Sequence, residues 1–393
     1  MANDLPLPLL NGLTPTQFLK EYWQKKPLLI KKAIAGFSGL LSPEELAGLA
    51  CEDDVQSRII QQKDGQWMLK NGPFTDKDFS QLPSKDWTLL VQSVNHYLPE
   101  AARLLQQFDF IPHARLDDLM ISYAPPGGGV GPHLDSYDVF LLQGQGKRLW
   151  RINEAFDADH SLIEGAPLGI LKNFVTSQEW LLEAGDMLYL PPQIAHWGIA
   201  VSAKNNANME ENCMTYSIGF RAPKNQELVA EFLGFLQDKL AQQKISIPGI
   251  YQDMDLILQE HPAEIGHDMI KEVSTNLKKI QWSDVDIAEF LGTYLSEPKA
   301  DVFFNTNKKI AMRVFSENLS NHGIALALKS QMLFFNDIFY MNGEQATFTG
   351  VSASILKELA DKRAISSKTI ADKHLLKQLY DWYIAGYLWF DID

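Results

Sequence analysis

Two sequence segments restrict the possible folds of this chain more than any other feature. The first, residues 125–138, reads PPGGGVGPHLDSYD, and the second, EAGDMLYLPPQIAHWG, contains His196. In an extended strand residues i and i+2 point to the same face, so His133 and Asp135 can reach one ion while Leu134 points away. His196 lies 63 residues after His133 and must return on another strand. The two segments therefore favour a β-barrel.

The side chains of His133, Asp135 and His196 form a candidate metal site. Two imidazoles and one carboxylate can bind three adjacent positions of an octahedral metal, as in non-haem Fe(II) oxygenases. A His-x-Asp triplet alone is a weak signal, because many arise by chance. Its surroundings strengthen it. Residues 127–129 are all glycine and predict a side-chain-free approach for a large ligand. The run from Gly185 through LYLPP predicts a turn, a buried strand and a second turn before His196.

These motifs resemble those of the JmjC branch of the cupin superfamily, Fe(II)- and 2-oxoglutarate-dependent oxygenases. The resemblance extends to the bacterial RoxA-type ribosomal oxygenases through ISYAPPGGGVGPHLDSYDVFLLQGQGKRLWRI, LYLPPQIAHWG and YSIGFRAP. It covers about the first 220 residues closely and the remainder in layout. It implies Fe(II), 2-oxoglutarate as cosubstrate and dioxygen. It also implies a ribosomal protein substrate, the large-subunit protein L sixteen, hydroxylated at the β-carbon of an arginine.

The resemblance further implies two cosubstrate-binding residues. Arg148 takes the place of the base that binds the distal carboxylate of 2-oxoglutarate, and Ser122 that of its hydroxyl partner. A guanidinium group matches a carboxylate in two hydrogen bonds. Strand alternation should turn the neighbouring Lys147 to the opposite face. The alternatives are a solvated arginine and an ordinary strand serine.

Substrate recognition is predicted on the strand that carries Ser122. If that hydroxyl points inward, Asp118 and Met120 share its face. A buried carboxylate is costly unless it is paired. The resemblance supplies the guanidinium of a substrate arginine as the partner, with Tyr137 packing beside it and Met120 lining the slot. The alternative is a partner within the chain, such as Arg115, Arg221 or another internal cation.

The strand pattern predicts an α+β protein with a double-stranded β-helix core, the jelly roll of the cupins. Residues 116–221 contain short apolar strands separated by turns. Gly144-Gln145-Gly146 predicts a hairpin turn between two antiparallel strands. Together with the residues that precede it, this region forms the predicted oxygenase domain, residues 1–222.

The first hundred residues look mostly helical. Capping boxes with proline at the first helical position predict helix starts at Thr14 and Ser42. KKPLLIKKAI between them predicts a short strand. Residues 87–105 are apolar at helical spacing and predict a helix. His96 in that run and His160 belong to neither motif, so both are poor ligand candidates.

Residues 223–300 are predicted to form an acidic helical segment. It contains 7 Lys and Arg against 13 Asp and Glu, counted from residue 224. One helical face carries an apolar stripe, which is either core or a dimer interface. The stripe residues are Leu228, Phe232, Phe235, Leu236 and Leu240. The resemblance favours the interface, because RoxA-type enzymes dimerise through helices that follow the JmjC domain.

Residues 301–393 mix helices with a hairpin at Asn342-Gly343, and the resemblance implies a winged-helix-like domain. From residue 300 onward the chain has 10 Lys and Arg and 10 Asp and Glu. The basic footprint of a DNA-binding domain is therefore absent, which disfavours a DNA-binding regulator.

Composition agrees with a cytoplasmic enzyme that binds no membrane. Of the 393 residues 46% are hydrophobic and 21% charged, and no run is long enough to span a bilayer. Cys51 and Cys213 are the two cysteines, which fits a reducing compartment. The net charge of −14 argues against non-specific nucleic-acid binding. Two alternatives stay open: an oxygenase acting on another protein or an RNA, and a non-redox metal-binding cupin. Arg148 argues against the second, since such a cupin needs no 2-oxoglutarate clamp.

Overall fold

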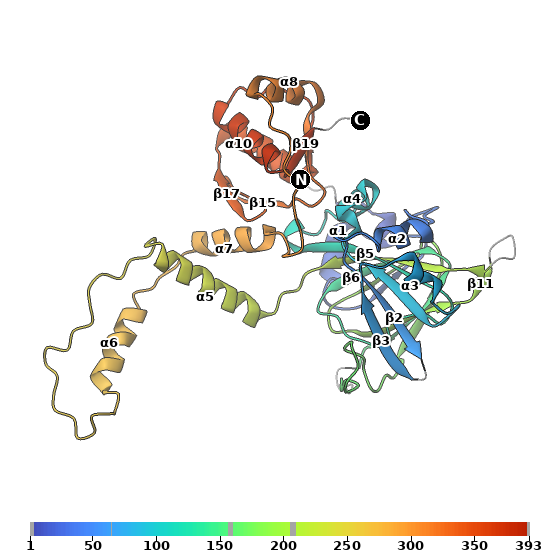
Figure 1. The fold of residues 1–393 in the computed structure, drawn as a ribbon, viewed down its shortest axis with the longest axis horizontal. Helices are drawn as coiled ribbons and strands as arrows, with labels where there is room; N and C mark the ends of the chain where they lie inside the picture. Colours follow the sequence, from blue (N-terminus) through green and yellow to red (C-terminus); the bar gives the residue numbers. More distant parts are fainter. Residues whose placement is uncertain (1–3, 64, 156–159, 205–209, 391–393) are drawn as a thin grey trace.

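The N-terminal half of the molecule is a jelly roll of two antiparallel sheets (Figure 1), seen in a computed structural model that describes residues 4–63, 65–155, 160–204 and 210–390. The larger sheet has eight strands in the order β1-β9-β6-β13-β5-β4-β2-β3, and the smaller has three in the order β10-β7-β8. The larger sheet consists of β1 (Leu28–Ile30), β2 (Ser57–Lys63), β3 (Gln66–Asn71), β4 (Trp87–Val91), β5 (Leu116–Ala124), β6 (Asp138–Gln145), β9 (Met187–Leu190) and β13 (Cys213–Phe220). The smaller consists of β7 (Lys147–Asn153), β8 (Gln178–Leu182) and β10 (Ala195–Val201), and β11 (Ala203–Lys204) pairs with β12 (Glu210–Glu211).

Strand β6 is central to the packing, because it is buried on both faces. Val139 and Leu141 join a cluster with Trp150 of the smaller sheet. Phe140 and Leu142 alternate to the other face and join the main core. Short helices cover that face with apolar side chains. They are α1 (Pro15–Glu21), α2 (Pro43–Leu49) and α4 (Pro99–Gln106), and α3 (Asp76–Ser80) lies between β3 and β4 in the chain.

Both predicted helix starts are confirmed. The Thr14 side chain accepts a hydrogen bond from the Gln17 N–H, and Oε1 of Gln17 accepts one from the Thr14 N–H. Ser42 and Glu45 form the same reciprocal box at the start of α2. The predicted strand in KKPLLIKKAI is β1.

The prediction of a helix over residues 87–105 is wrong, as is the mostly helical character of the first hundred residues. Trp87–Val91 is strand β4, followed by a short 3-10 helix, η2 (Val94–His96), and only then by α4. All five residues of β4 are buried. A strand buried on both faces is a continuous apolar run, and periodicity alone cannot separate it from a buried helix.

The predicted hairpin at Gly144-Gln145-Gly146 is also wrong. β6 pairs with β9 and β13, whereas β7 pairs with β8 and β10, so the chain here crosses from one sheet to the other. The glycines are needed for close packing at this corner. A Cβ on Gly144 would lie 2.4 Å from the Tyr216 ring, and one on Gly146 would lie 2.6 Å from the Asn212 carbonyl oxygen.

Three helices form the acidic segment: α5 (Asn225–Ala241), α6 (His267–Leu277) and α7 (Asp284–Ser296). The predicted apolar stripe on α5 is the half-buried to buried side of that helix, and it packs on α7. The Phe232 ring centroid lies 5.4 Å from that of Phe290, for example. Figure 1 shows α6 and its flanking segments standing away from the rest of the molecule.

The C-terminal part has a hydrophobic core of its own. Its helices are α8 (Met312–His322), α9 (Gly350–Lys362) and α10 (Lys373–Ile384). Its strands are β14 (Ile324–Leu326), β15 (Met332–Phe335), β16 (Ile338–Met341), β17 (Glu344–Thr347), β18 (Ala364–Ile365) and β19 (Leu388–Phe390). The predicted hairpin is confirmed, since β16 and β17 pair across Asn342-Gly343. Among the helices that the structure describes, none is long and apolar enough to cross a membrane.

Candidate active site

Two backbone hydrogen bonds hold His133 and His196 side by side. Each N–H donates to the carbonyl of the other residue at 3.0 Å. His196 lies in β10, whereas His133 lies in the loop before β6. The two residues pair as an isolated antiparallel bridge. This reciprocal pairing fixes the register of the two residues. The centroids of the two imidazole rings are consequently 4.2 Å apart.

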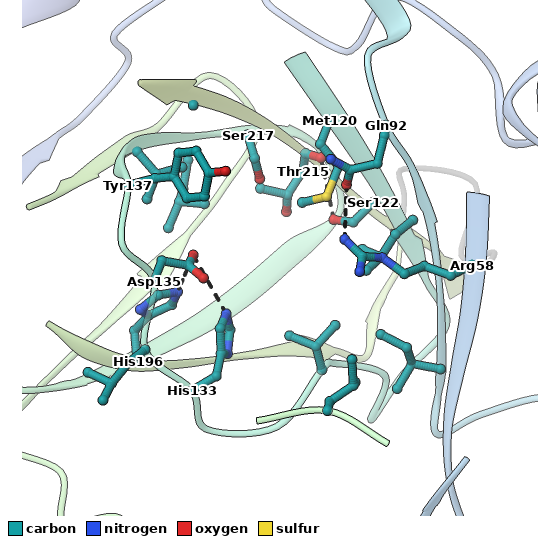
Figure 2. A pocket seen from close by; sticks show the side chains of 18 of the residues that line it. Arg58, Gln92, Met120, Ser122, His133, Asp135, Tyr137, His196, Thr215 and Ser217 are labelled. Carbon is teal, nitrogen blue, oxygen red and sulfur yellow. Dashed lines mark hydrogen bonds and ion pairs between the residues drawn. The ribbon is translucent and has the colours of Figure 1, made fainter. Parts of the chain in front are cut away.

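The carboxylate of Asp135 completes the cluster (Figure 2). Its Oδ2 lies 3.8 Å from Nε2 of His133 and 3.6 Å from Nε2 of His196. One ligand atom from each of the three side chains lies within 4.8 Å of the others. Two imidazole nitrogens and one carboxylate oxygen are the donor set typical of non-haem Fe(II) sites, so these residues fit that metal.

Hydrogen bonds on the far side of each imidazole orient the ring. Nδ1 of His133 lies 2.9 Å from the Gly131 carbonyl oxygen, and Nδ1 of His196 lies 2.8 Å from that of Ile194. A carbonyl oxygen only accepts, so Nδ1 carries the proton in both rings and the Nε2 lone pairs face the cluster. Burial, with a smaller effect of neighbouring His133, lowers the pKa of His196 to about 4. His196 is therefore neutral near pH 7, as a metal ligand must be.

The cluster lines a cavity of about 430 Å³ whose walls come from both sheets. Every site residue predicted from the sequence lines the same cavity. They are Asp118, Met120, Ser122, His133, Asp135, Tyr137, Arg148 and His196. The structure thus brings together residues as far as 78 positions apart in the chain.

Arg148 is a buried cation without a carboxylate partner in the described part of the chain. It lies in β7 with only 3% of its surface exposed, and its Nε donates to Sγ of Cys213 at 3.2 Å. Its Nη2 is buried and has no hydrogen-bond partner among the described residues. An unpaired buried guanidinium is unfavourable, and a carboxylate ligand in the cavity would relieve it. Lys147 is turned the other way, toward Glu183, as alternation predicts.

Small hydroxyl side chains line the wall next to Arg148. Ser122 of β5 is buried, and its Oγ lies 3.4 Å from the Thr215 carbonyl oxygen. Thr215 and Ser217 face the cavity from β13, while Tyr216 and Ile218 alternate into the main core. The alternation of TYSI predicts this arrangement, although sequence reasoning did not single out Thr215 or Ser217 as site residues.

Asp118 is held by hydrogen-bond donors and not by a cation. Its Oδ2 accepts from the N–H and Oγ of Ser93, both at 2.9 Å, and from Nε2 of Gln92 at 3.3 Å. Two of the cations considered as internal partners are engaged elsewhere, Arg115 with Asp138 and Arg221 with Asp117. Burial, and then the neighbouring Asp117 carboxylate, raise the pKa of Asp118.

Arg58 is a second cavity cation, one that sequence reasoning missed. It lies in β2, donates through Nη2 to Oε1 of Gln92 at 3.2 Å, and has a buried Nε without a described partner. Figure 2 shows it across the cavity from the histidines. It was missed because β2 lies in the region read as helical. The sequence did contain a sign of a strand here, because Arg58 is followed by the two β-branched residues Ile59 and Ile60.

The interpretation of residues 127–129 as an open approach for a ligand is wrong. A Cβ on Gly128 would lie 2.0 Å from the Trp87 carbonyl oxygen, and one on Gly129 would lie 2.4 Å from that of Gly198. These glycines let the loop pack directly against the backbones of β4 and β10. None of the three lines the cavity.

The other two histidines considered are not ligands in the described cluster. His96 lies in η2 outside the cavity, and burial lowers its pKa to about 4. His160 is exposed and lies between the two motifs in the chain.

Family models match two parts of the chain. Residues 103–228 match the JmjC domain, and residues 279–389 match the ROXA-like winged helix. The chain is 36% identical over 291 residues to the ribosomal protein uL16 3-hydroxylase of Escherichia coli strain K12, covering 72% of each chain. It is 38% identical over 222 residues to a probable ribosomal oxygenase of Haemophilus influenzae, covering 55% of this chain and 52% of that one.

Solved structures show the same similarity over nearly the whole length. An X-ray structure of Escherichia coli YcfD has a TM-score of 0.82 at 32% identity and covers 95% of this chain and 97% of that one. A structure of the ribosomal oxygenase YcfD with cobalt and 2-oxoglutarate has a TM-score of 0.80 at 31% identity, covering 96% and 98%. With a two-sheet core, a His-Asp-His cluster and a winged helix in one chain, the protein belongs to the JmjC ribosomal oxygenases, a family of Fe(II)- and 2-oxoglutarate-dependent dioxygenases.

Proposed function

We propose that the protein hydroxylates the β-carbon of an arginine side chain in a large-subunit ribosomal protein, uL16. The observation that carries this proposal is one cavity with the His-Asp-His cluster, the unpaired guanidinium of Arg148 and the buried carboxylate of Asp118. The name of the E. coli relative, a uL16 3-hydroxylase, supports the target protein and the β position.

In this proposal His133, Asp135 and His196 are the protein ligands of Fe(II). When bound, Fe(II) and 2-oxoglutarate supply the oxidation, in which dioxygen gives one atom to succinate, formed with loss of CO2, and one to the substrate C–H bond. Arg148 binds the distal carboxylate of 2-oxoglutarate, and Ser122 donates a hydrogen bond to it. Both groups are fixed by their strands before any ligand enters, so little ordering entropy is lost on binding.

Asp118 binds the guanidinium of the target arginine, with Met120 and Tyr137 as the walls of the slot. A neutral substrate side chain would leave the buried carboxylate unpaired, which is a strong basis for discrimination. Lysine supplies the charge without the two-pronged geometry, so it should be a poor substrate.

The test is mass spectrometry of a uL16 peptide incubated with the enzyme, Fe(II) and 2-oxoglutarate. We expect the wild type to add one oxygen atom at arginine, and His133→Ala to add none while it stays folded. His160→Ala is the matched control, because that histidine is exposed and outside the cavity. Asp118→Ala should lose arginine hydroxylation yet retain slow, uncoupled 2-oxoglutarate turnover. Full activity of His133→Ala, or equal hydroxylation by Asp118→Ala, would contradict the respective assignment.

The domain organisation in this proposal is an oxygenase domain (1–222), a dimerisation segment (223–300) and a winged-helix-like domain (301–393). The homodimer is supported by apolar side chains that nothing in the described chain covers. On α5 and α6 they include Val229, Leu233, Met269, Ile270, Val273 and Leu277, each at least 44% exposed. These side chains lie outside the α5 stripe, which packs on α7. The equal number of basic and acidic residues from residue 300 onward supports a structural or protein-contact role for the winged helix.

A further inference from the structure

One cavity residue comes from outside the oxygenase domain. Lys299 follows α7, yet it lines the cavity together with Asp118 and Tyr137. Two features just before it in the chain hold its position. Pro298 ends α7 and keeps the preceding residue extended. In the last turn of α7, Oγ of Ser296 accepts a hydrogen bond at 3.0 Å from the N–H of Gly343, in the β16–β17 turn of the winged helix.

Lys299 and Arg221 share one carboxylate oxygen. Nζ of Lys299 and Nε of Arg221 each lie 2.9 Å from Oδ1 of Asp117. Two cations therefore pair with Asp117 through this one oxygen. Asp118, the next residue, differs: its Oδ2 accepts from Ser93 and Gln92, and no cation in the described chain forms an ion pair with it.

We propose that Lys299 is a positioning residue for the substrate: with Arg221 it occupies Asp117, so that Asp118 alone remains to bind the substrate cation. The inference rests on the proposed function, in which Asp118 receives an arginine side chain. It gives the segment after α7 a direct part in substrate selection, because a residue of that segment sets the charge at the slot. It also explains why two adjacent carboxylates can face one cavity without both competing for the guanidinium.

The charge of Lys299 also favours the ionised form of Asp118. Burial, and then the neighbouring Asp117 carboxylate, raise the pKa of Asp118, and the Lys299 ammonium opposes them. Removing that ammonium leaves the pKa of Asp118 higher still, so the carboxylate is protonated at a higher pH and loses the guanidinium. The other charged or titratable groups around this pair include Arg221 on Asp117, Arg58 on Gln92, the Tyr137 phenol and His96, whose pKa is lowered by burial and then by Lys299.

The experiment measures binding of a fluorescent uL16 peptide to the metal-free protein across a pH series, so that iron loading plays no part. We expect Lys299→Met to weaken binding about tenfold near neutral pH and to move the acid limb of the binding curve to higher pH. Lys299→Arg should restore both, because it keeps the charge. Lys329→Met is the matched control: like Lys299, this lysine lies outside the oxygenase domain and pairs with one of its aspartates, Asp54 at 3.1 Å, but it lies outside the cavity.

Asp118→Ala distinguishes a failure of this inference from a failure of the proposed function. Weak binding by Asp118→Ala with an unchanged curve for Lys299→Met would overturn this inference and leave the proposed function intact. Equal binding by the wild type and Asp118→Ala would overturn the substrate assignment and this inference with it. A pH-independent loss in Lys299→Met that Lys299→Arg fails to restore would show a packing role only, and would also overturn the inference. Thermal unfolding of each variant checks that it is folded.

Discussion

The oxygenase core buries its large apolar side chains, whereas the helical segment leaves many of them exposed. In the core, Phe140 and Tyr189 are fully buried between a sheet and the helices that cover it. On α6, Ile270 and Leu277 are 53% and 61% exposed, and Met254 in the preceding loop is 88% exposed. The jelly roll completes its core within one chain, whereas the segment between α5 and α7 leaves apolar side chains exposed. A cavity needs rigid walls, and the jelly roll supplies them within the described chain.

The largest expected effect is on the free energy of unfolding, and it tests whether the buried side chains of the jelly roll stabilise the protein more than the exposed ones on α6. Phe140→Ala should lower the free energy of unfolding by about 3–5 kcal/mol, because it leaves a cavity among packed aromatic rings. Ile270→Ala removes a comparable apolar group from an exposed face and should change the stability of the monomer by less than about 0.5 kcal/mol. Urea unfolding followed by tryptophan fluorescence measures both. Similar losses in the two variants would contradict the comparison.

The second effect concerns the rigid walls of the cavity. Arg148→Ala should weaken the apparent affinity for 2-oxoglutarate by about 2–4 kcal/mol, because a buried charge pair is lost. Binding of the metal should barely change. Lys147→Ala is the control, since that neighbour points to the opposite face, toward Glu183. Steady-state succinate formation at varied 2-oxoglutarate gives the affinity. An unchanged value for Arg148→Ala would move the carboxylate site to another base, for which Arg58 is the candidate.

The third effect addresses the exposed segment. Ile270→Asp and Leu277→Asp should each weaken dimerisation by about 2 kcal/mol, because a carboxylate would be buried at the contact. Glu272→Gln on the same helix is the control. Light scattering at micromolar concentration measures the mass. A monomeric wild type would end the proposal of a dimer. Substitutions in the α5 stripe would be a poorer test, because Phe232 and Phe235 pack on Phe290 of the same chain.

The smallest effect comes from the ion pairs that join α5 to α7. Nζ of Lys239 lies 2.6 Å from Oδ1 of Asp286 and 2.8 Å from Oε2 of Glu289. The hydrogen bond from Lys239, with those from Ser283, lowers the pKa of Asp286 to about 2. The stabilisation that these bonds give the folded state is fully present above pH 3.8, the ordinary pKa of an aspartate. It is lost as the pH falls through about 2, the pKa of Asp286 in the folded protein.

Because this pair is only partly buried and lies at the rim of the α5–α7 contact, Lys239→Met should cost only about 0.5–1 kcal/mol at pH 7. The difference from the wild type should shrink as the pH falls below 4, measured by thermal unfolding across that range. An equal loss at pH 7 and pH 2 would show that packing of the lysine on the Phe235 ring, 4.8 Å from its centroid, is the cause.

The sequence alone determined the metal-binding cluster, the capped helices and the wing hairpin. The helix starts, the wing hairpin and the His133–Asp135 pair depend on residues close together in the chain, whereas His196 was identified from the motif around it, 63 residues after His133. His133 and Asp135 are two residues apart, and the boxes at Thr14 and Ser42 close within four residues. Local geometry of this kind needs no knowledge of the fold.

Only the tertiary structure revealed the further cavity residues and the packing around the site. The continuous apolar run in β4 hid a strand, and with it the strand pairing that brings Arg58 to the cavity. Gly128, Gly129 and Gly146 are set by close approach to distant backbones, and Gly144 by close approach to the Tyr216 ring, which no local pattern encodes. Lys299 reaches Asp117 across 182 positions because α7 ends at a proline that directs it there. Burial and long-range pairing are properties of the whole fold, so a local sequence window cannot contain them.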